Sequence, residues 1–293
     1  MPRRPRIQLD KFPLHIVQRG HNREACFFGE EDYQSYLHWL GEALAEHECA
    51  LHAYVLMTNH VHLLLTPKRA ASVPRLIMSL GRRYVQYINR THGHSGTLRD
   101  SRYKSSVVHA DSYLLTCHRY IELNPVRAAM VDGPAHYRWS SYRHNALGKA
   151  DSHLTPHPVY EAIAATDKGR QSAYRALFRS HPDAAAIDDI RLALNQNQPL
   201  GNSRFHAQIE KRLGERRAAR PRERPRREEA DAVRVLPGQG TIKEQLEGPE
   251  LKGPGLIFPA SQAITLALTR LPSHLCLARR TSARVLPCQW TCT

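Results

Sequence analysis

The chain of 293 residues is long enough for one large domain or two small ones with a genuine hydrophobic core. No stretch reaches the roughly 18 consecutive apolar residues of a membrane span, and the opening residues lack the apolar segment of a signal peptide, so we expect a cytoplasmic protein with no membrane partner. The six cysteines form no CxxC pair, which favours reduced thiols over disulfides and argues against a zinc finger, while the formal net charge of +15 makes nucleic acid the leading partner.

The first half of the chain predicts alternating strands and helices. Residues 14–19 alternate in polarity and stop at Gly20, which indicates a strand, and residues 30–47 carry apolar side chains at helical spacing. Residues 50–57 predict a second strand, which turns at Thr58 and Asn59 into a third.

A second helix is expected to start with Ser72 as its N-cap and Pro74 in its first turn, and residues 105–108 predict a fourth strand. The order strand, helix, hairpin, helix, strand is that of an α+β fold of the ferredoxin-like, split βαβ type. We therefore expect one antiparallel sheet with these helices on one side.

The third strand carries His60 and His62 with one residue between them. Alternate residues of a strand point to the same face, so the two imidazoles converge, while Val61 points to the other face. A divalent metal or a phosphate could reach the imidazoles there. On this pattern alone, two ordinary polar-face histidines are the more common interpretation.

A further helix is expected over residues 113–124, with Asp111 as its N-cap. Tyr120 and Asn124 are four residues apart and therefore neighbours on one helical face, although Pro125 disturbs the geometry at Asn124. The alternative interpretation is a packing tyrosine followed by a C-cap asparagine.

Basic residues cluster in the middle of the chain. Nine Lys or Arg stand between positions 68 and 104 against the single acid Asp100, namely Lys68, Arg69, Arg75, Arg82, Arg83, Arg90, Arg99, Arg102 and Lys104. A solvated basic surface would look similar, but the clustering favours a face that follows phosphates. We assign DNA contacts to Arg82, Arg83, Arg102 and Lys104.

Several motifs in order resemble one known family. The strand around His60-Val61-His62, the segment Arg102-Tyr103-Lys104-Ser105 and above all the run from Arg119 to Arg127 resemble the HUH single-tyrosine transposases, and within them the REP-associated, insertion-sequence-like group. Downstream segments at residues 139–142 and 200–205 are also similar to that group. The resemblance covers about residues 8–217.

The resemblance implies a DNA strand transferase in which Tyr120 is the nucleophile and His60, His62 and Asn124 bind a divalent metal, Mg2+ or Mn2+. Such an enzyme nicks single-stranded or hairpin DNA, forms a 5′-phosphotyrosine and rejoins strands, and the group's association is with repetitive extragenic palindromes. The pattern does not identify a general base; His109 and His118 are the nearby candidates. Tyr84, Tyr87 and Tyr103 are candidates for stacking bases, with packing favoured for the first two.

Two other hypotheses stay open. One is a catalytically inactive DNA-binding protein of the same fold that recognises repetitive palindromes, and the other is a metal-dependent hydrolase that does not act on nucleic acid. The intact set of His60, His62, Tyr120 and Asn124 favours the enzyme over the inactive protein, and the basic cluster disfavours the hydrolase. The sequence is compatible with a monomer or a homodimer.

The domain division follows the change in composition. We expect a catalytic domain over residues 1–143, a polar linker over 144–158 and a helical appendage over 159–217 that helps to grip DNA. Residues 218–293 are Pro- and Gly-punctuated without a clear period, and we interpret them as a disordered or weakly ordered tail.

Overall fold

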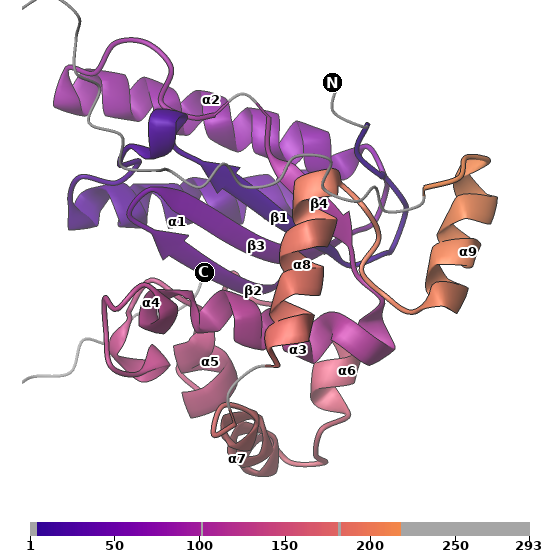
Figure 1. The fold of residues 1–293 in the computed structure, drawn as a ribbon. Helices are drawn as coiled ribbons and strands as arrows, with labels where there is room; N and C mark the ends of the chain where they lie inside the picture. Colours follow the sequence, from indigo (N-terminus) through magenta and orange to yellow (C-terminus); the bar gives the residue numbers. More distant parts are fainter. Residues whose placement is uncertain (1–4, 101, 181–182, 218–293) are drawn as a thin grey trace, which may run out of the picture. The chain divides into compact units, whose positions relative to one another are not determined.

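A four-stranded antiparallel sheet in the order β2-β3-β1-β4 is the centre of the structure (Figure 1). The computed structural model describes residues 5–100, 102–180 and 183–217. The predicted tail, 218–293, therefore lies outside the described residues. The strands are β1 (Leu14–Arg19), β2 (Cys49–Met57), β3 (His60–Pro67) and β4 (Lys104–Val107). This strand order and the α+β class confirm the predicted ferredoxin-like plan.

One face of the sheet is covered, as the sequence predicted, by α1 (Glu30–Glu46) and α2 (Ser72–His92), and the two helices pack against each other. Val61 and Leu63 lie in the same apolar core as Tyr36 and Tyr84, both nearly inaccessible to solvent. The Tyr84 hydroxyl donates to the carbonyl of Cys26 at 2.6 Å, so this tyrosine is a packing residue.

The other face is covered by α3 (Ala110–Glu122). Val55 of β2 and Leu64 of β3 share a second apolar core with Leu114 and Ile121 of α3. Successive side chains of a strand point to opposite faces. Both faces of β3 are therefore buried, and His62 belongs to the face that α3 covers.

Two predicted helix caps are wrong. Ser72 is the first residue inside α2, and its N-cap position is Ala71, which makes no side-chain cap. Helix α3 starts at Ala110 after His109, so Asp111 lies in its first turn, where a carboxylate still offsets the helix dipole.

The third helix also ends earlier than predicted, at Glu122. Leu123 leaves helical geometry with ψ near 0°, and α4 (Asn124–Arg127) begins a new turn with Pro125 near its start. Proline fits the first turn of a helix because the amide hydrogen that it lacks would have no partner there. Asn124 is therefore the first residue of α4 and not the last of α3.

The remaining helices are α5 (Tyr142–Leu147), α6 (Pro158–Glu161), α7 (Asp167–Leu177), α8 (Ala184–Gln196) and α9 (Ser203–Leu213). Two one-turn 3-10 helices lie at His21–Arg23 and Pro134–His136. Within the predicted linker, the Thr155 amide donates to the Leu51 carbonyl at 2.7 Å, so this segment is tied to β2. Helix α8 contacts β1, β4 and α3 (Figure 1).

Later segments bond to both outer strands of the sheet. Beside β4, the Leu200 amide donates to the Val107 carbonyl at 2.7 Å, and Asn197 Oδ1 accepts from the Ser105 amide at 3.2 Å. Beside β2, the Leu56 amide donates to the Trp139 carbonyl at 2.9 Å. These bonds use backbone groups that an outer strand would otherwise expose.

The described cysteines, Cys26, Cys49 and Cys117, are buried free thiols, as predicted. Within the described ranges, none of the helices combines the length and the apolar character that a membrane crossing requires.

Candidate active site

The two histidines of β3 lie close to a third histidine from β1. His62 pairs with Val17 in the strand register, and its Nδ1 lies 2.9 Å from Nε2 of His15. The ring centres of His60 and His62 are 5.1 Å apart. His60 Nδ1 lies 2.6 Å from Oδ1 of Asn59 in the preceding turn, so one nitrogen of each β3 histidine is held by the protein.

Tyr120 comes from α3 and packs on this histidine group. Its ring centre is 5.7 Å from that of His15 and 5.8 Å from that of His62, both in edge-to-face geometry. The residue is 8% exposed, so its ring is held by packing while it still lines a pocket. Such a setting fixes the direction of the side chain.

Arg127 also contacts Tyr120. Its guanidinium carbon lies 4.3 Å from the centre of the Tyr120 ring, and Nη2 donates to the Tyr120 carbonyl at 2.8 Å. The chain breaks at Leu123 between the two residues, and Arg127 is the last residue of the short helix α4. A planar guanidinium suits both the stacking and the hydrogen bond.

A pocket of about 470 Å³ brings most of the predicted site residues together. His60, His62, Tyr120, Asn124, Arg102 and Lys104 line it, together with Val17, Arg19, Asp100, Arg127, Ala128, Arg191, Leu194 and Asn195. Five of these side chains are Lys or Arg against one acid. The pocket is thus suited to an anion such as a phosphodiester.

Four pocket or near-pocket residues were not predicted: His15, Arg19, Arg127 and Arg191. The alternation of β1 offered a signal for His15, since it shares a face with Val17, the partner of His62. Arg191 comes from α8, far along the chain, and no local pattern indicates its position.

Burial keeps the histidines of this group neutral. Desolvation, followed by the charges of Arg19 and Arg127, lowers the pKa of His60 to about 4. Desolvation also lowers the pKa of His62 well below its usual range, and that of His15 to about 3. A neutral imidazole is the form that can ligate a metal.

His60, His62 and the Asn124 amide are side chains at the pocket with atoms that could ligate a divalent metal. No group of three or more His, Cys, Asp and Glu in the described part of the chain is arranged to hold one, so a metal here would depend on His60, His62 and the amide of Asn124. Asn124 Nδ2 is buried without a partner among the described residues, and the two ends of an amide are hard to distinguish. A ligand that binds the Asn124 amide would give its unpaired polar atom a partner.

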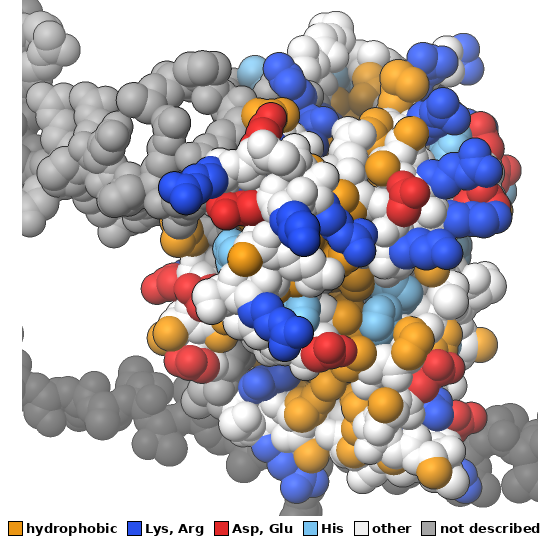
Figure 2. Space-filling model, turned by 90° about the vertical axis from the view of Figure 1, so that its right-hand side faces the viewer, with side chains coloured by type: hydrophobic (Ala, Val, Ile, Leu, Met, Phe, Trp, Pro, Cys, Tyr) orange, Lys and Arg blue, Asp and Glu red, His pale blue; other side chains and the backbone are white. Residues whose placement is uncertain are grey.

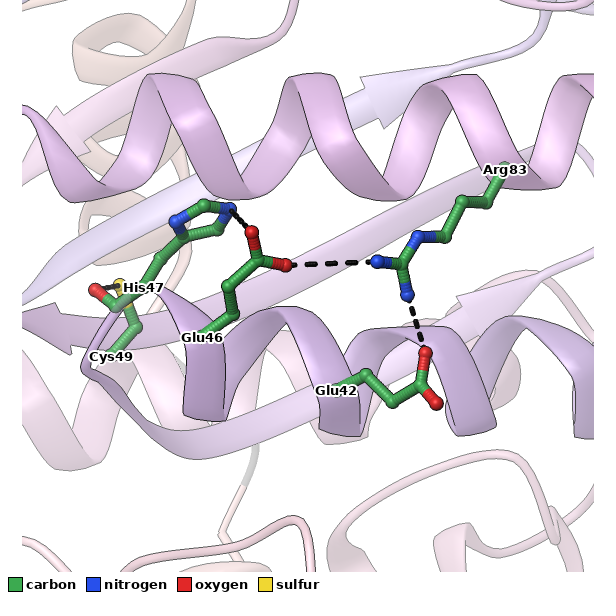
Figure 3. Close-up of polar contacts among 5 residues, drawn as sticks. All are labelled: Glu42, Glu46, His47, Cys49 and Arg83. Atoms are coloured by element: carbon green, nitrogen blue, oxygen red, sulfur yellow. Dashed lines mark hydrogen bonds and ion pairs between the residues drawn. The ribbon is translucent and has the colours of Figure 1, made fainter.

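Other predicted residues lie away from the pocket. Arg83 pairs with Glu42 and, at 3.7 Å, with Glu46 of α1 (Figure 3), and Arg82 is exposed on the same helix, α2, which covers the other face of the sheet. His109 Nδ1 lies 2.9 Å from the Ser112 hydroxyl, and it does not line the pocket.

The second candidate base, His118, is buried on the far side of α3, with Nδ1 3.2 Å from the Tyr174 hydroxyl. Beside it, Glu122 accepts from Ser141 Oγ at 2.6 Å, Asn145 Nδ2 at 2.9 Å and the Tyr174 hydroxyl at 2.8 Å. Burial raises the pKa of this carboxyl to about 7 despite these bonds. The network anchors α3, and with it Tyr120, to the helices that follow.

The basic run from Lys68 to Lys104 does not form one surface. Arg99 is buried against the rings of Tyr36 and Tyr84, Arg83 is in ion pairs, and Arg102 lines the pocket. On the face shown in Figure 2, Lys and Arg side chains stand in separate groups among acidic and apolar ones. Of this run, Arg102 and Lys104 line the pocket, and the predicted phosphate-following face stays a prediction.

A histidine pair on a strand, facing a helix-borne tyrosine in a basic pocket, defines a site suited to phosphodiester chemistry. Residues 8–124, which include all four of His60, His62, Tyr120 and Asn124, match the family model described as "Transposase IS200 like". This match confirms the predicted resemblance to the single-tyrosine transposases for that part of the chain.

Two solved structures are similar. A REP-associated tyrosine transposase bound to a REP hairpin has 13% identity and a TM-score of 0.43, covering 54% of this chain and 93% of that one. A putative transposase from Deinococcus radiodurans R1 has 21% identity and a TM-score of 0.30, covering 41% of this chain and 96% of that one. No curated protein matches the chain. Both TM-scores are below 0.5, and the family match carries the assignment.

Proposed function

We propose that the protein cuts and rejoins single-stranded or hairpin DNA with Tyr120 as the nucleophile. The observation that carries this proposal is the meeting of Tyr120 with His60, His62 and Asn124 in one pocket lined by five basic side chains. The transposase family of residues 8–124 supports DNA as the substrate.

In this reaction Tyr120 Oη attacks the scissile phosphorus in line with the leaving oxygen. The bond between phosphorus and the 3′ oxygen breaks, the phenol proton passes to solvent, and the leaving oxygen takes up a proton to become a 3′ hydroxyl. The products are a 5′-phosphotyrosine and a free 3′ end. Because one phosphodiester replaces another, rejoining by the reverse attack requires no nucleotide cofactor.

The chain's own residues orient the partners. The His15 and His62 rings and the Arg127 guanidinium pack on the Tyr120 ring, and the basic side chains hold the phosphate near it. Preorganised positive groups stabilise the charge that develops in the transition state. Mg2+ or Mn2+ held by His60, His62 and Asn124 would supply Lewis-acid polarisation of the scissile phosphate.

The test is a covalent-trapping experiment with the full chain. A labelled single-stranded hairpin DNA is incubated with Mn2+ and the products are separated under denaturing conditions. We expect a protein–DNA adduct with the natural protein and none with Tyr120→Phe, which keeps the packed ring and loses the hydroxyl. Tyr113→Phe is the matched control, since Tyr113 lies on the same helix and its hydroxyl faces Asp189 at 3.3 Å.

Mass spectrometry of the DNA-linked peptide identifies the nucleophile directly. An adduct on Tyr84, Tyr87 or Tyr113, or normal cleavage by Tyr120→Phe, would contradict the proposal. Tight DNA binding without any adduct would support the second candidate, an inactive DNA-binding protein of this fold.

A further inference from the structure

A second hollow, of about 240 Å³, adjoins the catalytic pocket. Arg102, Lys104 and Asn195 line both. Lys104 Nζ donates to Asn195 Oδ1 at 2.7 Å, so the boundary between the hollows is a contact between β4 and α8. The two hollows are thus neighbours that share these three side chains.

The walls of the second hollow are basic and polar. Arg6 and Gln8 of the N-terminal segment form one side, and Asn195 and Asn197 at the end of α8 form the other. Among the described residues, no acidic side chain lines it, which favours phosphate groups there. Amide side chains can both donate to and accept from the edges of bases.

Arg6 is held in a fixed plane. Its guanidinium carbon lies 3.7 Å from the centre of the Tyr103 ring, and Nε donates to the Tyr103 carbonyl at 3.0 Å. Tyr103 itself is 8% exposed, so the tyrosine supports the guanidinium from below. Arg6 is only partly buried, and a supported guanidinium can stack on a base from its outer side.

We propose that the second hollow binds unpaired nucleotides that flank the scissile phosphate, with Arg6 as the stacking platform and the neighbouring amides as contacts to base edges. This inference rests on the proposed function, because it takes the first pocket as the place of cleavage. The flanking bases must be unpaired, since a base within a duplex offers neither its face nor its pairing edge to a side chain.

The experiment measures binding of fluorescein-labelled oligothymidylate, about eight nucleotides long, by anisotropy over a range of salt concentrations. All variants carry Tyr120→Phe so that no strand is cut. We expect Arg6→Ala to weaken binding at least about fivefold and to lower the slope of log K against log salt by about 0.7. Arg6→Lys keeps the positive charge but loses the planar guanidinium. It should therefore restore the salt dependence of binding more fully than the affinity.

The matched control is Arg138→Ala, which removes another guanidinium stacked on an aromatic ring, 4.4 Å from the centre of Trp139. Its binding is expected to equal that of the parent protein, and thermal melting of each variant checks its folding. A second readout is photo-crosslinking with 4-thiothymidine, which should label the peptides that contain Arg6 or Tyr103.

The outcomes separate the two proposals. If Arg6→Ala binds the oligonucleotide like the Arg138→Ala control while natural protein still forms the Tyr120 adduct, the second hollow is not a nucleotide site and the proposed function stands. If Arg6→Ala weakens binding and no adduct ever forms, the nucleotide site stands and the proposed chemistry falls.

Discussion

The guanidinium of Arg127 lies over the Tyr120 ring, 4.3 Å from its centre, and is tied to the Tyr120 carbonyl by a 2.8 Å hydrogen bond. One residue thus contacts both the side chain and the backbone of the proposed nucleophile. Arg127 also lines the pocket, so it is close to where a phosphate would lie.

We expect Arg127→Ala to slow formation of the Tyr120 adduct at saturating DNA by about 10- to 100-fold, the rate effect of roughly 1–3 kcal/mol. Arg127→Lys should recover only part of the rate, because an ammonium keeps the charge but cannot stack as a plane. Single-turnover rates and DNA affinity are measured separately. Weaker affinity with an unchanged saturating rate would show that Arg127 binds DNA instead of positioning Tyr120.

Metal binding is expected to depend on the histidine pair. His60→Ala combined with His62→Ala should abolish Mn2+ binding measured by calorimetry, and a chelator should imitate that loss in cleavage assays, while Tyr120 stays in place. The control is His109→Ala, which removes an imidazole outside the pocket. Equal Mn2+ affinity in the double variant would place the metal elsewhere.

His15 should strengthen metal binding indirectly, through its hydrogen bond with His62. A ligating His62 Nε2 requires the proton on Nδ1, and His15 Nε2, 2.9 Å away, is then the acceptor of that proton. We expect His15→Phe to weaken Mn2+ binding about 10- to 100-fold, the usual effect of losing such a supporting contact, and His15→Gln to restore part of it. If His15→Phe binds Mn2+ normally, the contact between the two rings is structural only.

The basic residues predicted to contact DNA can be ranked by their positions. Arg102 lines the pocket, whereas Arg83 is paired with Glu42 and Glu46 on the other side of the sheet. Arg102→Ala should lower the salt slope for single-stranded DNA by about 0.7, while Arg83→Ala should change it less. A larger effect at Arg83 than at Arg102 would mean that α2 is the main DNA-binding surface.

Stability should depend on pH through Glu122, whose buried carboxyl has a pKa raised from 4.5 to about 7. Its stabilising effect is complete below the unfolded pKa and is lost as pH rises through about 7, a change of about 3 kcal/mol. Glu122→Gln cannot ionise and should therefore gain stability relative to the natural protein between about pH 5 and pH 8. Urea unfolding at several pH values measures this difference, and a constant difference would argue against an ionising Glu122.

Much of the catalytic sheet could be predicted because its signals are local. The strand period alone placed His60 and His62 on one face, and the order of elements indicated the sheet topology. The two cap predictions were wrong because Ser72 and Asp111 have high N-cap propensity but lie one or two residues inside their helices. Tertiary packing can override such a local preference.

The rest of the site depends on tertiary contacts. Arg127 contacts the Tyr120 ring and carbonyl across the break at Leu123, where the chain ends one helix and starts another. Arg83 and Arg102 look alike in the sequence, and only the packing of α2 on α1 gives Arg83 its acidic partners. Neighbouring charges in a sequence therefore did not indicate neighbouring charges in space.

The position of α8 in the chain has a consequence for biosynthesis. Arg191 and Asn195, which close one side of the pocket, follow Tyr120 by about 70 residues, and at about 5–20 residues per second the ribosome needs roughly 4–15 s to add them. During that interval the nascent polypeptide carries its tyrosine on α3 and its histidine pair on β3 without the side of the pocket that α8 supplies. The cleft is completed only after the late helix has emerged and docked.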